Sequence, residues 1–232
     1  MSINDHVNIG EDNEITNFRE IRMGKIPEGL LYRGSYPIFN MEPERDNAYN
    51  KLVSDAKIEC VINLADNESG MERIANSVLW YRELMKKNKI IGLDIQFLFD
   101  FEDKKEYQVF KNKLKQGFLF LIAHNGPYLI HCNAGNDRTG FVAAIMEGLL
   151  GATINEILYD YLLSYGKEFA DDKTGSNINA GDIILRQLNA IVNGEINDEV
   201  NFQSNIEKYF LYEIGLSEKE LELLKERLTR KV

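Results

Sequence analysis

The sequence predicts an α/β fold in which a mostly parallel central sheet is flanked by helices, with extra helices at the C-terminal end. Up to Leu150, short apolar runs alternate with segments of helical periodicity. This alternation is typical of a parallel sheet that is covered by helices on both faces. Beyond Leu150 the pattern is helical almost to the end of the chain, so we expect the closing helices to pack on the core as a cap.

Four apolar runs have the length of strands and are expected to form the sheet: residues 29–35, 58–64, 90–99 and 128–132. A helix is expected from Met71, where apolar residues recur at helical spacing. A second helix is expected over residues 110–122, whose apolar side chains share one face. The sequence "NGP" at 125–127 should end that second helix, because glycine and proline interrupt regular structure.

Two of the closing helices are marked by capping boxes. Thr153 with Glu156 precedes "ILYDYLLSY", and Ser217 with Glu220 precedes "LELLKERL". The stretch between these helices, residues 166–181, is rich in turn-forming residues and is expected to be a loop.

Length and composition are those of a globular protein. The chain has 232 residues, of which 44% are hydrophobic, enough for a substantial core. We expect residues 1–232 to form a single domain, with the helices of residues 153–232 packed on it. No apolar run approaches the roughly 20 residues that span a bilayer, so no stable membrane insertion is expected.

Charge and cysteine content limit the expected partners and location. The net charge of −10 disfavours binding to nucleic acid and to anionic membranes. The polar, acidic N-terminal stretch is unlike a secretory signal, and two cysteines do not make a disulfide framework. A cytoplasmic protein with reduced thiols is therefore expected, with signal-independent export and the oligomeric state left open.

The stretch "HCNAGNDRTG" at residues 131–140 is the strongest functional feature. If a strand ends at Cys132 and a helix begins near Arg138, the loop between them can aim successive backbone amides at one centre and bind an anion. Gly135 permits backbone angles that other residues resist. The planar guanidinium of Arg138 can hold two oxygens of a phosphate. The expected phosphate-binding residues are Asn133, Ala134, Gly135, Asn136, Asp137 and Arg138.

Cys132 is expected to lie beneath this loop as the nucleophile. The positive field that binds phosphate also stabilises a thiolate, which is the nucleophilic form of cysteine. His131 is expected to fix the loop by hydrogen bonding to the backbone. Thr139 is expected to donate a hydrogen bond to the sulfur and so make it a better leaving group. A lone cysteine is more often a small buried hydrophobe, but here histidine, glycine, arginine and hydroxyl spacing coincide with a strand–loop–helix pattern.

The stretch resembles the HC-x5-R-(S/T) signature of cysteine-based protein tyrosine phosphatases, and more closely the HC-x-A-G-K-D-R-T-G loop of bacterial tyrosine and lipid phosphatases. Other segments are similar to that family too: "NFREI" before "GLLYRGS", "GATINEILYDYLLSY" and "YFLYEIGLSEKELELL". The resemblance implies a protein tyrosine phosphatase-like fold and hydrolysis of phosphomonoesters through a phosphocysteine intermediate. It also implies a phosphorylated protein or peptide substrate, no metal and no cofactor.

One position departs from the related loops. They carry lysine before Asp-Arg, whereas this chain has Asn136. In the inositol-lipid phosphatases that this loop resembles, basic loop residues bind the additional phosphates. Asn136 therefore favours a protein tyrosine or dual-specificity phosphatase. Two alternatives stay open, a phosphoinositide or inositol-phosphate phosphatase and a phosphate-binding pseudophosphatase that turns over poorly.

Three aspartates are candidates for the general acid that protonates the leaving group. Asp100 and Asp103 precede Cys132 by about thirty residues, where the broader family carries its acid. Asp137 lies in the loop itself, where the acid role has been assigned in the bacterial relatives. Each of them could instead be a helix-start residue, because the helix dipole favours a negative charge there. Asp137 and Asp100 are equal leading candidates, and Asp103 follows them.

Three further residues carry two interpretations each. Cys60 lies in an expected core strand, where we expect it to pack; the alternative is a resolving thiol that protects Cys132 as a disulfide on oxidation. Arg33 and Ser35, in "YRGS", either support the site or simply end a strand.

Overall fold

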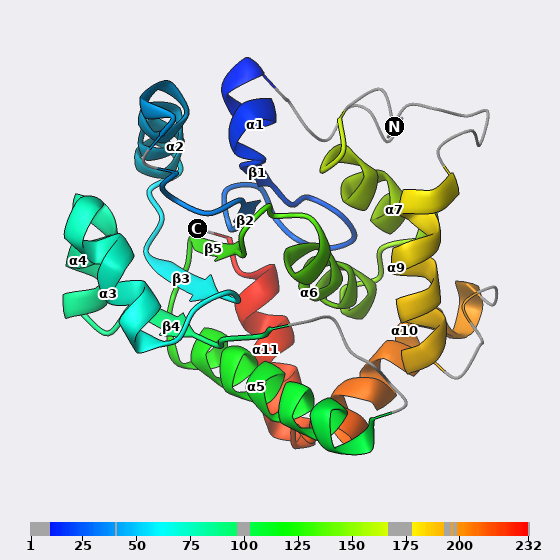
Figure 1. The fold of residues 1–232 in the computed structure, drawn as a ribbon. Helices are drawn as coiled ribbons and strands as arrows, with labels where there is room; N and C mark the ends of the chain where they lie inside the picture. Colours follow the sequence, from blue (N-terminus) through cyan, green and yellow to red (C-terminus); the bar gives the residue numbers. More distant parts are fainter. Residues whose placement is uncertain are drawn as a thin grey trace.

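The computed structural model of the protein describes residues 10–39, 41–96, 103–166, 178–192, 196 and 199–231 (Figure 1). A sheet of five strands runs through its centre in the order β1-β2-β5-β3-β4. The strands are Arg19–Glu20 (β1), Leu31–Gly34 (β2), Cys60–Asn63 (β3), Ile90–Gly92 (β4) and Tyr128–His131 (β5). β1 pairs antiparallel with β2, and all other neighbours are parallel. The predicted mostly parallel sheet is therefore confirmed.

Helices cover both faces of the sheet because side chains alternate between the faces along each strand. Val61 and Leu129 point to the face covered by α2 (Pro43–Asp55), α3 (Glu68–Ser77) and α4 (Leu79–Lys86). Ile62 and Ile130 point to the opposite face and its larger core. The helices on that side include α5 (Lys104–Ala123), α6 (Asp137–Leu149) and α11 (Glu218–Thr229).

The remaining helices lie at the ends of this arrangement. α1 (Glu11–Thr16) lies beside α2 in Figure 1. The helices predicted over residues 153–232 are α7 (Ile154–Leu163), α9 (Ile178–Ile191), α10 (Glu199–Lys208), a short π-helix (Tyr209–Ile214) and α11, and all of them contribute side chains to the larger core. Both predicted capping boxes are present, at the starts of α7 and α11. None of the helices in the described segments has the length and apolar character needed to cross a membrane.

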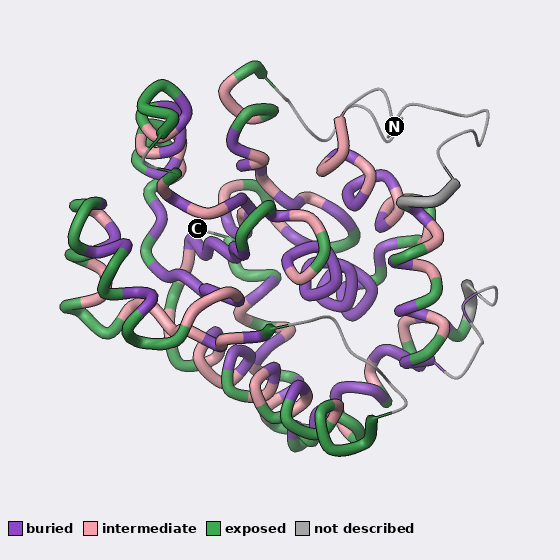
Figure 2. The backbone as a smooth tube through the Cα atoms, viewed as in Figure 1, coloured by how far each residue is buried: buried purple, intermediate pink, exposed green. Residues whose placement is uncertain are grey.

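Helix α6 occupies the middle of the larger core. Every residue from Thr139 to Leu149 is buried, and Figure 2 shows this helix as a nearly continuous purple tube. Because its flanks are packed on all sides, the first turn of α6 is held rigidly where the preceding loop enters the core. This first turn carries Asp137 and Arg138.

Two predicted segments differ from the structure. The strand expected over residues 90–99 ends at Gly92, because Asp94 takes a left-handed backbone conformation (φ 46°) that turns the chain away from the sheet. The loop expected over residues 166–181 includes the start of α9 at Ile178, and its residues 167–177 lie outside the described segments. Burial of Ile184 and Leu188 on one face outweighs the turn-forming residues at the start of that helix.

Candidate active site

The nucleophile loop, residues 132–138, lies where the carboxyl ends of the parallel strands meet. Cys132 directly follows β5, which lies between β2 and β3, and α6 begins at Asp137. Open parallel sheets bind ligands at this edge, because the helices that follow the strands begin there. The predicted strand–loop–helix arrangement around Cys132 is present.

The sulfur of Cys132 faces the inside of this loop. Its side chain is 2% exposed, and the backbone amide of Gly135 donates a hydrogen bond to Sγ over 3.3 Å. A backbone N–H aimed at sulfur stabilises a negative charge on it. The thiol is therefore buried beneath the backbone of the loop.

Three carbonyl oxygens of the loop accept hydrogen bonds from outside it: Asn133 from the amide of Tyr36 (2.8 Å), Ala134 from Asn17 Nδ2 (3.0 Å) and Gly135 from Arg33 Nη2 (2.8 Å). In a trans peptide, the C=O of one residue and the N–H of the next point in opposite directions. With the carbonyls held outward, the amides of residues 134–136 point inward. The loop is thus an anion nest whose walls are fixed from behind.

Gly135 is required by the backbone of this loop. Its φ is +81°, and a Cβ added there would lie 2.7 Å from the carbonyl oxygen of Gly34 and 2.9 Å from the amide nitrogen of Ser35. Any larger residue would push the loop away from the end of β2. The expectation that glycine is needed at this position agrees with the geometry.

Arg138 lies in the first turn of α6 and is half-buried. Its Nη1 donates to the carbonyl oxygen of Ile95 over 2.7 Å. A guanidinium has five N–H donors, so this bond orients the group and leaves the Nε–Nη2 edge for an anion. The arrangement fits the expected bidentate contact to a phosphate.

Together, the inward amides, the sulfur and the guanidinium lie around the start of α6. A family model described as "Tyrosine phosphatase family" matches residues 13–230.

The chain belongs to the tyrosine phosphatase family.

A tyrosine-protein phosphatase from Nostoc commune is 31% identical over 130 residues, an alignment that covers 50% of this chain and 44% of the relative. The chain thus spans less than half the length of that relative.

The expected contact of Thr139 with the sulfur is not formed in this family member. Thr139 Oγ1 is buried and has no hydrogen-bond partner among the described residues. The hydrogen bond on Sγ comes instead from the amide of Gly135, which the loop aims at the sulfur. The backbone of the loop, not a side chain of α6, reaches Sγ here, and the leaving-group role of Thr139 stays a prediction.

His131 is fully buried at the end of β5. Its Nδ1 lies 3.4 Å from the carbonyl oxygen of Cys132, which can only accept, so Nδ1 carries the proton. The ring packs edge-on against Tyr36 and Tyr81. Burial lowers the pKa of His131 to about 4, so the imidazole is neutral at pH 7. The expected role of His131 in fixing the loop through this contact stays a prediction.

Acid should destabilise the protein through His131. Between about pH 4 and pH 6.5 the unfolded chain binds a proton at His131, whereas the folded protein does not. The free energy of unfolding should therefore fall by about 2 kcal/mol between pH 7 and pH 5 through this residue alone. Urea unfolding of the wild type and His131→Phe at both pH values measures it. Equal pH dependence in the two proteins would contradict the assignment.

Asp137, one of the two leading acid candidates, lies at the first position of α6 and is exposed. Its Oδ1 accepts hydrogen bonds from the hydroxyls of Tyr161 (3.3 Å) and Tyr165 (3.2 Å). These tyrosines orient the carboxyl beside Arg138 at the mouth of the loop. No sequence pattern indicated this pair, because they come from α7 and the turn that follows it.

Of the other two acid candidates, Asp103 has a structural role at the start of α5. The Asp103 carboxylate caps α5 by accepting hydrogen bonds from the amides of Lys105 (2.8 Å) and Glu106 (3.0 Å). A cap of this kind is a sufficient structural reason for an aspartate there. Asp100 lies outside the described residues.

Cys60 cannot act as a resolving thiol in this fold. Cys60 in β3 is the register partner of Tyr128 in β5. Cys132 lies four residues after Tyr128, at the other end of β5. At about 3.3 Å per residue the two Cα atoms are separated by roughly 13 Å, far beyond the reach of a disulfide. Cys60 Sγ donates instead to the carbonyl oxygen of Asn125 (3.3 Å), and burial raises its pKa to about 11. The packing interpretation of Cys60 fits these contacts.

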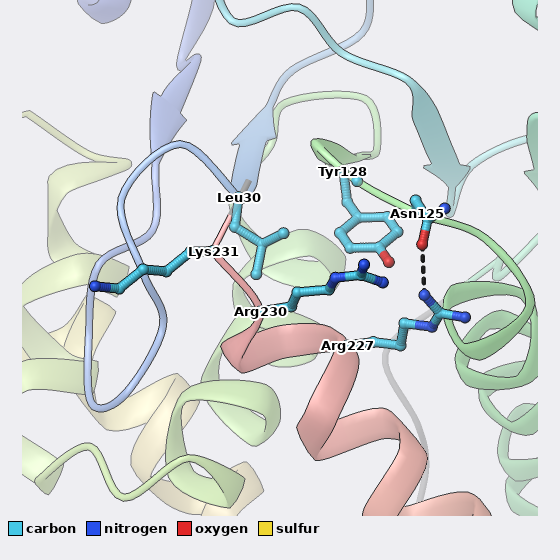
Figure 3. Close-up of a pocket in the computed structure, with 7 residues that line it drawn as sticks. Leu30, Asn125, Tyr128, Arg227, Arg230 and Lys231 are labelled. Atoms are coloured by element: carbon cyan, nitrogen blue, oxygen red, sulfur yellow. Dashed lines mark hydrogen bonds between the residues drawn. The ribbon is translucent and has the colours of Figure 1, made fainter.

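A cavity of about 220 Å³ lies at the other end of the sheet (Figure 3). Its lining includes Leu30, which precedes β2, and Tyr128, which begins β5. Arg227 reaches it from α11 and donates to Asn125 Oδ1. The cavity lies at the amino ends of β2 and β5. Cys132 follows the carboxyl end of β5, so the cavity is separate from the nucleophile loop. In the described segments, no group of three or more His, Cys, Asp and Glu side chains could hold a metal ion.

Proposed function

We propose that the protein is a metal-free, cofactor-free phosphomonoester hydrolase that acts on phosphotyrosine in proteins or peptides through a phosphocysteine intermediate. The observation that carries this proposal is the buried sulfur of Cys132, which accepts a hydrogen bond from Gly135 N–H inside an inward-facing nest of amides. A thiolate so held lies beneath the position where the nest would bind a phosphoryl group.

The reaction proceeds in two displacements at phosphorus. In the first, the Cys132 thiolate forms an S–P bond while the P–O bond to the leaving group breaks, and the acid gives its proton to the departing oxygen. In the second, water attacks phosphorus, the S–P bond breaks and releases the thiolate, and the same carboxylate takes the proton from the water. The loop amides and Arg138 hold the non-bridging oxygens through both steps.

The environment of Asn136 supports a phosphoprotein substrate. Its Oδ1 accepts a hydrogen bond of 2.7 Å from Asn17 Nδ2, so the side chain is directed toward α1 and carries no charge. A second or third phosphate on an inositol ring would find no cation at this position. A single phosphate on a tyrosine needs only the loop and Arg138.

A substrate panel in the presence of excess EDTA tests this proposal. We expect kcat/KM for phosphotyrosine peptides to exceed the values for phosphoinositides and soluble inositol phosphates by at least tenfold, with no loss caused by the chelator. A preference for inositol lipids would assign the alternative lipid-phosphatase function. If no phosphomonoester is hydrolysed, the pseudophosphatase alternative holds and the proposal is wrong.

The acid is identified by comparing leaving groups. Replacing the acid should slow hydrolysis of a phosphotyrosine peptide far more than that of an activated aryl phosphate, which needs little protonation. It should also remove the alkaline limb of the pH–rate profile. We expect this behaviour of Asp137→Asn or Asp100→Asn.

Asp103→Asn is the matched control, because asparagine caps a helix as well as aspartate does. It should leave both substrates and the pH profile unchanged. An equal loss on both substrates in Asp137→Asn would indicate that this residue positions Arg138 and is not the acid. If all three variants kept the alkaline limb, none of these three aspartates would be the general acid.

A further inference from the structure

A buried cluster of charged side chains lies directly behind the nucleophile loop. Asp160 in α7 accepts hydrogen bonds from Arg19 Nε (3.0 Å) and from Arg33 Nη1. All three side chains are at most 3% exposed. Burial alone would raise the pKa of Asp160, but the two arginines lower it below its ordinary value, so the carboxylate is charged. The cluster thus sets two buried positive charges against one negative charge.

Both arginines connect this carboxylate to the loop. Arg33 Nη2 donates to the carbonyl oxygens of Gly135 (2.8 Å) and Asn136 (3.3 Å). Arg19 Nη1 donates to Asn17 Oδ1 (2.5 Å). Asn17 in turn donates from Nδ2 to the carbonyl of Ala134 (3.0 Å) and to the side chain of Asn136 (2.7 Å). Two arms from one carboxylate therefore end on residues 134–136.

These contacts determine which way three successive peptides face. When the carbonyls of residues 134, 135 and 136 are held outward, the amides of residues 135, 136 and 137 must point into the loop. The amide of Gly135 shows the result, since it reaches Cys132 Sγ. Burying two arginines with one carboxylate contributes little to stability by itself, because desolvation offsets the attraction. Stability therefore does not account for this buried cluster, whereas a role in positioning the loop does.

We propose, resting on the proposed function, that Asp160 is a positioning residue. Through Arg33 and through the Arg19–Asn17 arm it orients the loop amides that bind the phosphoryl oxygens. Asp160 touches no reacting atom itself. Its removal should weaken the binding of any tetrahedral oxyanion as well as slow catalysis.

Glu147 supplies a matched control within the same cluster. It lies in α6, is fully buried and interacts with Asp160. Burial and the charge of Asp160 raise its pKa well above the ordinary value, which favours the uncharged carboxyl. Glu147→Gln and Asp160→Asn are the same carboxyl-to-amide change at adjacent buried sites. Only the second removes a charge that holds the arginines.

The experiment measures kcat/KM for an activated aryl phosphate and the Kd of tungstate, with thermal unfolding as a check on folding. Asp160→Asn should lower kcat/KM by about 100-fold or more, because breaking a buried pair leaves uncompensated charge. Glu147→Gln should stay within about twofold of the wild type. If Asp160→Asn does not fold, Asn17→Ala decides, because Asn17 lies at the outer end of one arm.

Asn17→Ala should lower kcat/KM and weaken tungstate binding by about tenfold each, as expected for loss of a hydrogen bond that orients an oxyanion donor. Its control is Gln203→Ala, which removes an amide that donates to the carbonyl of Leu149 (2.9 Å) at the far end of α6. That variant should keep wild-type values. A purely structural role for Asn17 would change thermal stability while leaving tungstate affinity unchanged.

Failure of this inference is distinguishable from failure of the proposed function. Wild-type kcat/KM and tungstate affinity in both Asn17→Ala and a folded Asp160→Asn would overturn the positioning role while the hydrolase function stands. A wild-type protein that hydrolyses no phosphate ester, yet binds tungstate more tightly than Asn17→Ala does, would overturn the function and retain the positioning role. A wild-type protein that neither hydrolyses esters nor binds tungstate would overturn both.

Discussion

Replacing Cys132 with serine should abolish hydrolysis and leave the fold intact. A serine hydroxyl at this position stays protonated at neutral pH, so the nucleophile is lost although the side chain is nearly the same size. The Gly135 amide that donates to Sγ can donate to a hydroxyl oxygen instead, so the loop should keep its conformation. Steady-state turnover of an aryl phosphate measures the loss, and thermal unfolding checks the fold.

Cys60→Ser is the control for this substitution. It makes the same chemical change at the opposite end of the sheet, where the thiol donates to the carbonyl of Asn125 and a hydroxyl can do the same. Turnover should stay close to that of the wild type. If Cys132→Ser kept a substantial fraction of the wild-type rate, a phosphocysteine intermediate would be ruled out.

Arg138→Lys should lower kcat/KM by two to three orders of magnitude, or about 3–4 kcal/mol of transition-state stabilisation. Lysine keeps the positive charge but has no planar fork, so it cannot hold two phosphoryl oxygens at once. A lysine ammonium also cannot contact the phosphoryl oxygens and at the same time keep the hydrogen bond to the Ile95 carbonyl that orients the guanidinium. We expect kcat to fall and the inhibition constant of inorganic phosphate to rise.

Arg227→Lys is the matched substitution at a distant guanidinium. Arg227 donates to the carbonyl of Ile122 (3.0 Å) and to Asn125, at the end of the sheet away from the loop. This variant should hydrolyse the substrate at the wild-type rate. A near-wild-type Arg138→Lys would mean that charge alone, without fork geometry, is what the arginine supplies.

The local pattern around Cys132 was sufficient to predict the loop. An apolar run of strand length, a glycine at the position with φ of +81° and an apolar helix after Arg138 all lie within about twenty consecutive residues. Interactions within so short a stretch depend mainly on backbone angles and periodicity, which sequence encodes directly. The capping boxes of α7 and α11 were predictable for the same reason.

Helices with weak patterns were not predicted. α2 is largely polar, and only part of one face is buried, including Tyr49 and Val53. α1 is a six-residue acidic helix with one buried residue, Thr16. Such segments become helical because they pack against a neighbour, and nothing in their own spacing indicates that neighbour.

By itself, the sequence determined the α/β class and the strand–loop–helix arrangement around Cys132 with its glycine, because each follows from spacing along a short piece of chain. Only the tertiary structure decided what holds that loop in place. Asn17, Arg33 and Asp160 meet residues 134–136 from distant parts of the chain. It also separated Cys60 from Cys132 and gave the sulfur a backbone donor in place of Thr139. Contacts of this kind depend on which buried charges and carbonyls the packed core brings together, and no periodicity records them.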